Sequence, residues 1–135
     1  MRELKRIQQF DQHGCTIACI AMITDMSYFM VREMTQDKVA RLSQNPPVPP
    51  QFIGLYGGEV ANILEQIYEV PCKFVKFSSL IQMKKHCILW VTPLIWIDGG
   101  THVVVFDADK RCILDPMNML KNLDEYNVAC CIEID

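Results

Sequence analysis

Cys15 has the sequence neighbourhood of a catalytic thiol. Polar residues precede it, and residues 15–23 are apolar on nearly every side, which predicts a buried helix that begins near Gly14. Cys15 would then lie in the first turn, where unpaired N–H groups and the helix dipole stabilise a thiolate. A thiolate held at such a place is a nucleophile. An ordinary half-buried cysteine would fit the same position, so Cys15 needs partners elsewhere in the chain.

The chain has three histidines, and one of them suits the role of a base. His102 follows a Gly-Gly turn and is itself followed by four apolar residues, 103–106, which predicts that it begins a strand. A strand would hold the imidazole rigidly beside a cleft, as a general base requires. His86 follows two lysines and is expected on a solvated face. His13 lies two residues from Cys15 in the same loop and is poorly placed to act as its base. For His102 considered alone, the alternative is a core or surface histidine whose hydrogen bonds are satisfied and which has no catalytic role.

Asp115 is the candidate for orienting that base. It ends an apolar strand-like segment and is followed by Pro116, which would stop a strand. If residues 102–106 and 111–115 form a hairpin centred between positions 108 and 109, Asp115 pairs with His102. That register puts imidazole and carboxylate side by side. A plain Asp-Pro turn is the alternative, but the three residues together are more specific than any one of them.

Acyl transfer also needs hydrogen-bond donors that stabilise the negative oxygen of its tetrahedral intermediate. Gln9 lies six residues before Cys15, and its amide can act together with the Cys15 backbone N–H. Gln8 and Gln12 compete with Gln9 for this role. A glutamine in a polar loop is otherwise unremarkable.

These segments resemble the bacteriocin-processing peptidases and their relatives in the papain-like superfamily. Residues 9–23 resemble the family's nucleophile segment, and residues 94–106 with 113–116 resemble its histidine strand and Asp-Pro element. The resemblance implies that Cys15 is the nucleophile, His102 the base, Asp115 its orienter and Gln9 the oxyanion donor. Many members carry Asp-Cys-Gly at the nucleophile, where this chain has Gly-Cys-Thr. The sequence holds no transporter segments, so export-linked processing of double-glycine leader peptides is not expected.

The expected fold is α+β, a single papain-like domain over residues 1–135 with a helical first half and an antiparallel sheet after it. The expected helices are residues 15–23, residues 27–43 capped by Ser27, and one opened by Gly57-Gly58. The inner face of the second helix is expected to consist of Met30, Val31, Met34, Val39 and Leu42. The expected strands are residues 72–77, 87–91, 94–97, 102–106, 112–114 and 128–134, with a short helix over 79–86, turns at 98–100 and 107–110, and an extended proline-rich loop at 45–50.

The composition limits which binding partners and which cellular compartment are expected for this chain. The net charge of −3, with 21% charged residues, gives no electrostatic footprint for nucleic acid or an anionic membrane. Seven cysteines without a CxxC pair or zinc-finger spacing favour a reducing, cytoplasmic setting over a disulfide scaffold. No cofactor or metal is expected. The expected partner is a peptide or protein substrate, with selectivity from a narrow peptide terminus or an accessory protein.

The sequence therefore predicts a cysteine hydrolase that cleaves a peptide or amide bond through a thioester acyl-enzyme. Transfer of the acyl group to an amine would use the same residues. The alternatives of another class are a non-hydrolytic peptide-binding module on the same fold and a cysteine-rich redox or metal-binding protein.

Overall fold

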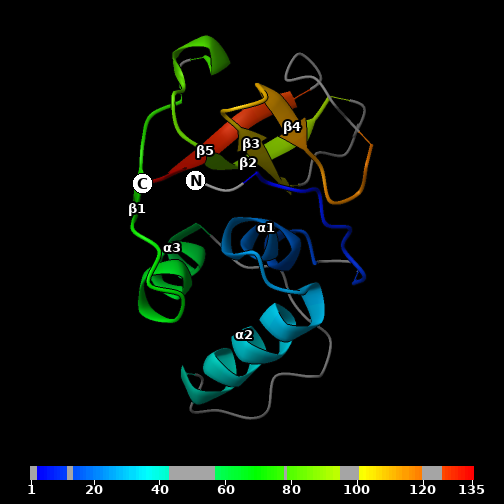
Figure 1. Cartoon of the computed structure of the whole chain (residues 1–135), viewed down its shortest axis with the longest axis vertical. Helices are drawn as coiled ribbons and strands as arrows, with labels where there is room; N and C mark the ends of the chain where they lie inside the picture. Colours follow the sequence, from blue (N-terminus) through cyan, green and yellow to red (C-terminus); the bar gives the residue numbers. More distant parts are fainter. Residues whose placement is uncertain (1–2, 12–13, 43–56, 78, 95–100, 120–125) are drawn as a thin grey trace.

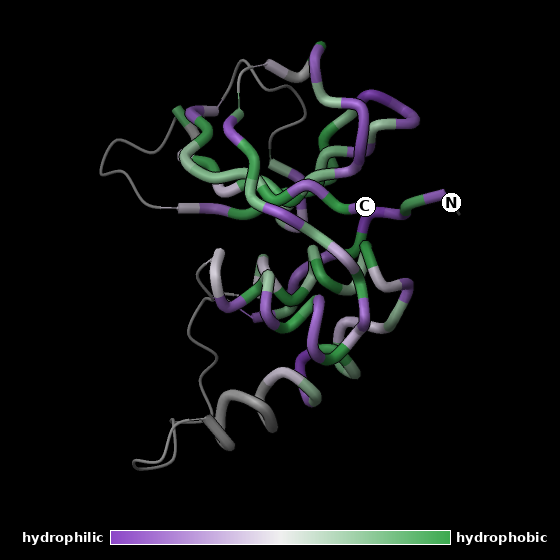
Figure 2. The backbone as a smooth tube through the Cα atoms, turned by 90° about the vertical axis from the view of Figure 1, so that its left-hand side faces the viewer, coloured by the Kyte–Doolittle hydropathy of each residue, from purple (hydrophilic) through white to green (hydrophobic). Residues whose placement is uncertain are grey.

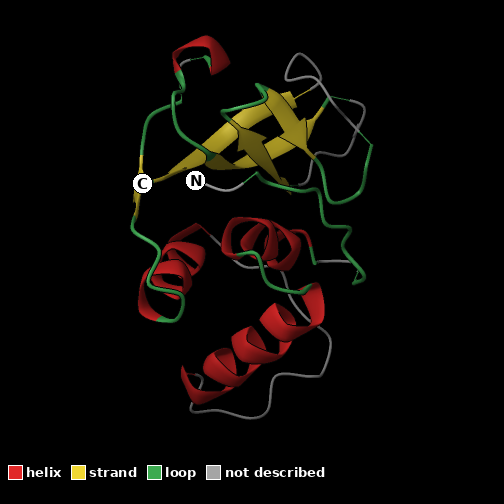
Figure 3. Ribbon diagram, viewed as in Figure 1, coloured by secondary structure: helices red, strands yellow, loops and turns green. Residues whose placement is uncertain are grey.

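The computed structural model describes residues 3–11, 14–42, 57–77, 79–94, 101–119 and 126–135, and its three α-helices precede the sheet along the chain (Figure 1). The described helices are α1 (Cys15–Thr24), α2 (Tyr28–Leu42), α3 (Gly57–Gln66) and a short 3₁₀ turn, η1 (Leu80–Gln82). The described strands are β1 (Cys72–Phe74), β2 (Cys87–Pro93), β3 (His102–Asp107), β4 (Cys112–Leu114) and β5 (Tyr126–Ile134). The predicted α+β class is confirmed (Figure 3).

The five described strands form one antiparallel sheet in the order β1-β5-β2-β3-β4. The three α-helices α1, α2 and α3 lie on one side of this sheet, with α1 next to β3 and α2 farther away, and the view turned by 90° shows the same two layers (Figures 1 and 2). Helix α3 packs against β1 and β5. Cys15, the first residue of α1, and His102, the first residue of β3, therefore lie on two elements in direct contact.

Helix α1 is buried on all sides, as its sequence predicts. Every residue from Thr16 to Met22 is buried, because α1 contacts the sheet on one side and α2 and α3 on the others. Complete burial of an isoleucine such as Ile17 or Ile20 is worth about 1.5–3 kcal/mol. This rigid core helix fixes the position of Cys15.

The opposite face of the sheet is also covered. A second cluster of buried residues lies there, formed by alternate residues of the central strands such as Leu89 of β2 and Val104 and Phe106 of β3. Met83, Val75 and Phe77 of the segment between β1 and β2 pack onto it. With both faces covered, all of β3 and residues 87–91 of β2 are buried.

The second helix differs in part from its prediction. Ser27 caps α2, since its Oγ accepts the Met30 backbone N–H at 3.1 Å. Val31 is buried and Met34 half-buried, but the inward placement of Met30 is wrong, because its side chain is 52% exposed. The side chains of Val39 and Leu42 lie outside the described residues. In α3 the apolar residues Val60, Ile63 and Leu64, whose spacing places them on one face of a helix, are buried, and Ile67 just beyond the helix is half-buried.

Several predicted strand bounds are also wrong. The strand expected over 72–77 pairs only over Cys72–Phe74, at the edge of the sheet, where a short strand limits open pairing. The helix expected over 79–86 is only the single turn η1, and residues 83–86 are irregular up to the start of β2 at Cys87. The last strand starts at Tyr126, two residues earlier than expected. The predicted features at 45–50, 95–97 and 98–100 lie outside the described residues.

The β3–β4 hairpin forms, but in a different register from the predicted one. Val105 pairs with Leu114, and Asp107 with Cys112, so the turn is centred between positions 109 and 110. Two features set this longer turn: the Asp107 carboxylate accepts the backbone N–H groups of the next turn residues, and Arg111 adopts a left-handed φ of 56°. A two-residue slip keeps each side chain on the same face of the sheet, so Asp115 still faces the side of His102.

Among the described residues, no single helix is long and apolar enough to cross a membrane. Helix α1 and the segment Tyr28–Thr35 together have that length and composition, but they meet at an angle of 112°.

Candidate active site

His102 and Asp115 form a buried pair. Nε2 of His102 lies 2.6 Å from Oδ1 of Asp115, and both side chains are at most 3% exposed. The carboxylate accepts further bonds from the backbone N–H groups of Met117 (2.8 Å) and Met119 (3.3 Å) and from the Tyr126 hydroxyl (3.3 Å). These donors fix the carboxylate, and the carboxylate fixes the imidazole ring.

Cys15 meets this pair from the helical layer. It is the first residue of α1, is half-buried, and its thiol hydrogen-bonds with His102. Because Nε2 of His102 is engaged by Asp115, Nδ1 is the ring nitrogen that faces the thiol. The N-cap of α1 is Gly14, so no side chain caps the first turn, and its N–H groups can stabilise negative charge beside the sulfur.

The environment of His102 favours the protonated ring. Burial opposes protonation, but the hydrogen bonds with Asp115 and Cys15 and the negative charge of both groups outweigh burial and raise the pKa of His102 to about 9. A protonated imidazole beside a thiol is one half of the thiolate–imidazolium pair through which catalytic cysteines react.

Gln9 is placed beside the same site by backbone bonds. Its N–H donates to the Pro116 carbonyl at 3.1 Å, so the N-terminal segment runs next to the end of β4. Its half-buried side chain donates from Nε2 to the Asp11 carbonyl at 3.0 Å, a bond that uses one of the two hydrogens of that NH₂ group. Of the two competing glutamines, Gln8 is exposed and Gln12 lies outside the described residues.

The sequence analysis missed Arg6 and Tyr126. The Arg6 guanidinium donates to the carbonyls of Asp115 (2.7 Å) and Pro116 (3.3 Å), which ties the segment of Gln9 to the Asp-Pro element. Tyr126 donates to Asp115 from the first residue of β5. Neither residue belongs to a periodic pattern or motif, so only the contact between distant segments reveals them.

The predicted solvated position of His86 is wrong. Its side chain is 4% exposed, and its Nδ1 accepts the Ala108 backbone N–H at 3.0 Å. Its own carbonyl accepts the Ile134 N–H at 2.8 Å. His86 therefore joins the start of β2 to the end of β5 and to the β3–β4 turn. His13 lies outside the described residues.

His86 also belongs to a group of described side chains whose ligand atoms lie close enough together to hold a cation. One atom each from His86, Asp107 and Asp109 lie within 4.8 Å of one another. However, the bond from Ala108 occupies the Nδ1 lone pair, and the neutral ring then carries its proton on Nε2, which leaves neither nitrogen ready to bind a metal. Asp107 Oδ1 also caps the turn through Asp109 and Lys110. The geometry fits a structural hydrogen-bond cluster.

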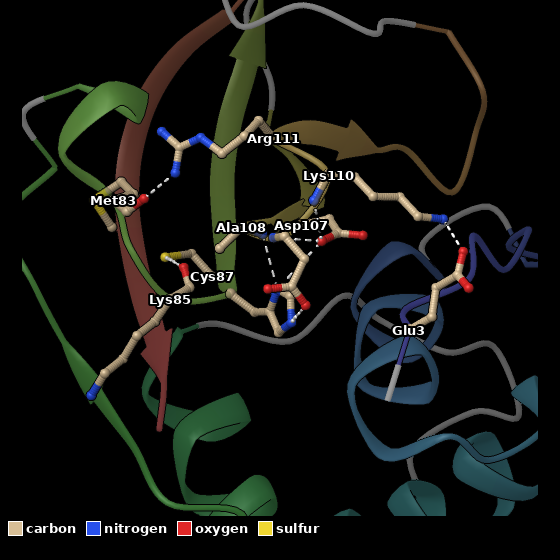
Figure 4. Close-up of polar contacts among 10 residues, drawn as sticks. Glu3, Met83, Lys85, Cys87, Asp107, Ala108, Lys110 and Arg111 are labelled. Carbon is tan, nitrogen blue, oxygen red and sulfur yellow. Dashed lines mark hydrogen bonds and ion pairs between the residues drawn. The ribbon is translucent and has the colours of Figure 1, made fainter. Parts of the chain in front are cut away.

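Other contacts strengthen this turn from both sides (Figure 4). Arg111 donates to the Met83 carbonyl on the segment before β2. Lys110 reaches the Glu3 carboxylate on the N-terminal segment. These contacts hold the hairpin end that lies opposite the candidate site.

All seven cysteines lie in described parts of the chain, and all are free thiols. Cys19, Cys87 and Cys131 are buried, where a free thiol behaves as a small apolar residue, whereas Cys112 and Cys130 are half-buried. Burial, with the nearby Cys15 and Asp115, raises the pKa of Cys19 well above its usual range. Cys19 donates to the Val103 carbonyl at 3.4 Å and so helps to seat α1 on β3.

The structure thus brings Cys15, His102 and Asp115 together and places Gln9 on the segment beside them. A scan against protein-family models gave no match for this chain, and a search of curated proteins found no match either.

Proposed function

We propose that this protein is a cysteine hydrolase of the papain-like type, in which Cys15, His102 and Asp115 form the catalytic triad and Gln9 contributes to the oxyanion hole. One observation carries the proposal. A half-buried thiol at the start of a core helix hydrogen-bonds with a histidine whose far nitrogen lies 2.6 Å from a buried carboxylate. This relay from thiol to imidazole to carboxylate is the arrangement that proton transfer from a nucleophile needs. A purely structural role for the three side chains would not require it.

In the proposed reaction, His102 Nδ1 takes the proton of the Cys15 thiol, and the thiolate attacks the carbonyl carbon of a peptide or amide. The negative oxygen of the tetrahedral intermediate accepts hydrogen bonds from the Cys15 backbone N–H and the Gln9 amide. When the C–N bond breaks, the imidazolium gives its proton to the leaving amine, and a thioester remains on Cys15. Water then attacks the thioester with His102 as base, which releases the acid and restores the thiol.

Asp115 orients the base throughout this cycle. Its hydrogen bond to Nε2 holds the ring so that Nδ1 points at the thiol, and its charge stabilises the imidazolium. The backbone donors from Met117 and Met119 and the Tyr126 hydroxyl hold the carboxylate in turn. Their role is to keep the base in one orientation during proton transfer.

Isopeptide cleavage, amide hydrolysis and acyl transfer to an amine would use the same residues, and the resemblance to bacteriocin-processing peptidases favours a peptide substrate. A peptide-binding module on this fold would need neither the thiol nor the imidazole–carboxylate pair. The arrangement therefore supports hydrolysis over binding alone.

The test is hydrolysis of a fluorogenic peptide library by the wild type, Cys15→Ala and Cys19→Ala. Cys19 is the matched control, since it lies one helical turn from Cys15 but is buried against Val103. We expect activity in the wild type and in Cys19→Ala, and none in Cys15→Ala. Activity that survives in Cys15→Ala, or a wild type that binds peptides without turnover, would contradict the proposal.

A further inference from the structure

The carboxylate of Asp11 joins the loop before Cys15 to helix α2. Oδ2 of Asp11 accepts the Tyr28 hydroxyl at 2.6 Å, and Nη1 of Arg32 lies 3.1 Å from Oδ1 and 3.2 Å from Oδ2. The Asp11 backbone N–H donates to the same Tyr28 oxygen at 3.1 Å. Asp11 is thus held by both its side chain and its backbone.

The carbonyl of Asp11 connects two groups of the proposed oxyanion hole. It accepts the Gln9 side-chain amide at 3.0 Å and the Gly14 backbone N–H at 3.1 Å. Gly14 is the N-cap of α1, directly before Cys15. The orientation of this one carbonyl therefore sets the Gln9 amide relative to the start of the nucleophile helix.

Tyr28 also contacts the N-cap directly. A Cβ atom added to Gly14 would lie 1.9 Å from the Tyr28 hydroxyl oxygen and 3.2 Å from the Asp11 carbonyl oxygen. The hydroxyl therefore fills the space that a side chain at position 14 would need. Burial and the hydrogen bond to Asp11 raise the pKa of Tyr28 to about 12, so the hydroxyl remains a donor across the working pH range.

We propose that Asp11, held by Tyr28 and Arg32, is a positioning residue that orients the Gln9 amide and the N-terminus of α1 as an oxyanion hole. This inference rests on the proposed cysteine hydrolase function. Asp11 acts through Gln9 and the helix start rather than on the thiol. The Arg32–Asp11 ion pair is about one-third exposed, and such pairs contribute little, so Tyr28 carries more of the positioning than Arg32.

Two reactions of the same thiol separate this role from general support of the fold. Acylation of Cys15 by p-nitrophenyl acetate passes through a negative tetrahedral oxygen and needs the oxyanion hole. Alkylation by iodoacetamide displaces iodide from a saturated carbon and forms no such oxygen. A residue that positions the oxyanion donors changes the first rate and spares the second, whereas loss of the fold or of the Cys15–His102 contact slows both.

The experiment measures both rates for the wild type, Asp11→Asn and Tyr28→Phe, with the background of Cys15→Ala subtracted. We expect acylation to fall about tenfold or more in both variants, a smaller loss than the hundredfold or greater effect of deleting an oxyanion donor itself. Alkylation should stay within about twofold. Asp25→Asn is the matched control, because Asp25 is an exposed aspartate at the other end of α1, and both rates should be unchanged.

A double variant tests whether Asp11 acts through Gln9. Asp11→Asn combined with Gln9→Ala should acylate no more slowly than the slower single variant, since interacting residues are not additive. Equal loss of acylation and alkylation, or no loss of acylation in an active protein, would overturn the assignment of Asp11 alone. A wild type that is alkylated at Cys15 but never acylated would overturn the proposed function as well.

Discussion

His102 Nε2 and Asp115 Oδ1 lie 2.6 Å apart, although the β3–β4 ladder does not place the two residues opposite each other. The observed register, continued from the Val105–Leu114 pair, sets Asp115 opposite Val104, two residues from His102. Diagonal neighbours on one face of a sheet remain within reach of long side chains. This contact fixes the ring and leaves Nδ1 for Cys15.

Replacing Asp115 by Asn should lower kcat/KM and shift its pH dependence. The raised pKa of His102, about 9, depends on the hydrogen bond and charge of Asp115. The imidazolium is lost as the pH rises through that value, so wild-type activity should fall above about pH 9. In Asp115→Asn this alkaline limb should move to lower pH, and kcat/KM at neutral pH should fall about tenfold or more.

Tyr126→Phe is the control for this substitution. It keeps the aromatic ring and removes the hydroxyl that donates the 3.3 Å bond to Asp115. We expect its pH profile to stay close to that of the wild type. An alkaline limb at the same pH in Asp115→Asn and the wild type would contradict the role of Asp115.

Folding stability should depend on the protonation of His102. Its pKa is raised from 6.5 to about 9, so the folded state binds the proton more tightly than the unfolded chain. The stabilisation is complete below pH 6.5 and is lost as the pH rises through about 9, and it amounts to about 3 kcal/mol at most. Urea unfolding at pH 6 and pH 9.5 should show a smaller pH-dependent loss in His102→Gln than in the wild type. An equal loss in both proteins would show that His102 is not the group responsible.

Gly14→Ala should destabilise the fold, because the added methyl would lie 1.9 Å from the Tyr28 hydroxyl. Overpacking of this kind costs about 1–3 kcal/mol. Tyr28→Phe should restore part of the loss, since it removes the clashing oxygen while the nearest ring carbon stays 3.1 Å away. The free energy of unfolding from urea titration measures both effects.

Gly58→Ala provides the comparison within the chain. A Cβ at Gly58 meets no atom within 4 Å, and alanine favours a helix by up to about 1 kcal/mol over glycine. We expect this variant to be as stable as the wild type or slightly more stable. Equal effects of the two alanine substitutions would contradict the close contact of Tyr28 with Gly14.

Cys15 should be the thiol that a small electrophile modifies first in the folded protein. It is half-buried and contacts His102, whereas burial raises the pKa of the partly exposed Cys72, Cys112 and Cys130. One equivalent of iodoacetamide at pH 7 should give a single adduct at Cys15 by peptide mass mapping. His102→Ala should lose this selectivity. Adducts spread evenly over the partly exposed cysteines of the wild type would be the contrary result.

The sequence predicted the elements that carry the site better than the contacts between them. The uninterrupted apolar run after Cys15 predicted a buried helix, and Pro116 predicted the end of a strand next to Asp115; both features depend on local residue types. The hairpin register was wrong by two residues, because it depends on the capping of the turn by Asp107 and on the left-handed Arg111. The error left Asp115 on the correct face, since side chains alternate with a period of two.

The residues that hold the site in place could not be predicted in the same way. His86 follows two lysines yet is buried, because distant backbone at Ala108 and Ile134 surrounds it. Arg6, on the N-terminal segment, and Tyr126, at the start of β5, contact Asp115 although they belong to other parts of the fold. Such contacts depend on the tertiary arrangement and leave no pattern within a single segment.

The most direct test of the central claim is labelling with a library of electrophilic peptides, followed by mass mapping of the modified residue. The experiment compares the wild type with Cys15→Ala and His102→Ala at neutral pH. Rapid labelling of the wild type at Cys15, with little labelling of either variant, is the predicted result, because His102 activates the thiol that attacks the peptide. Equal labelling of all three proteins would contradict the assignment of Cys15 and His102 as nucleophile and base.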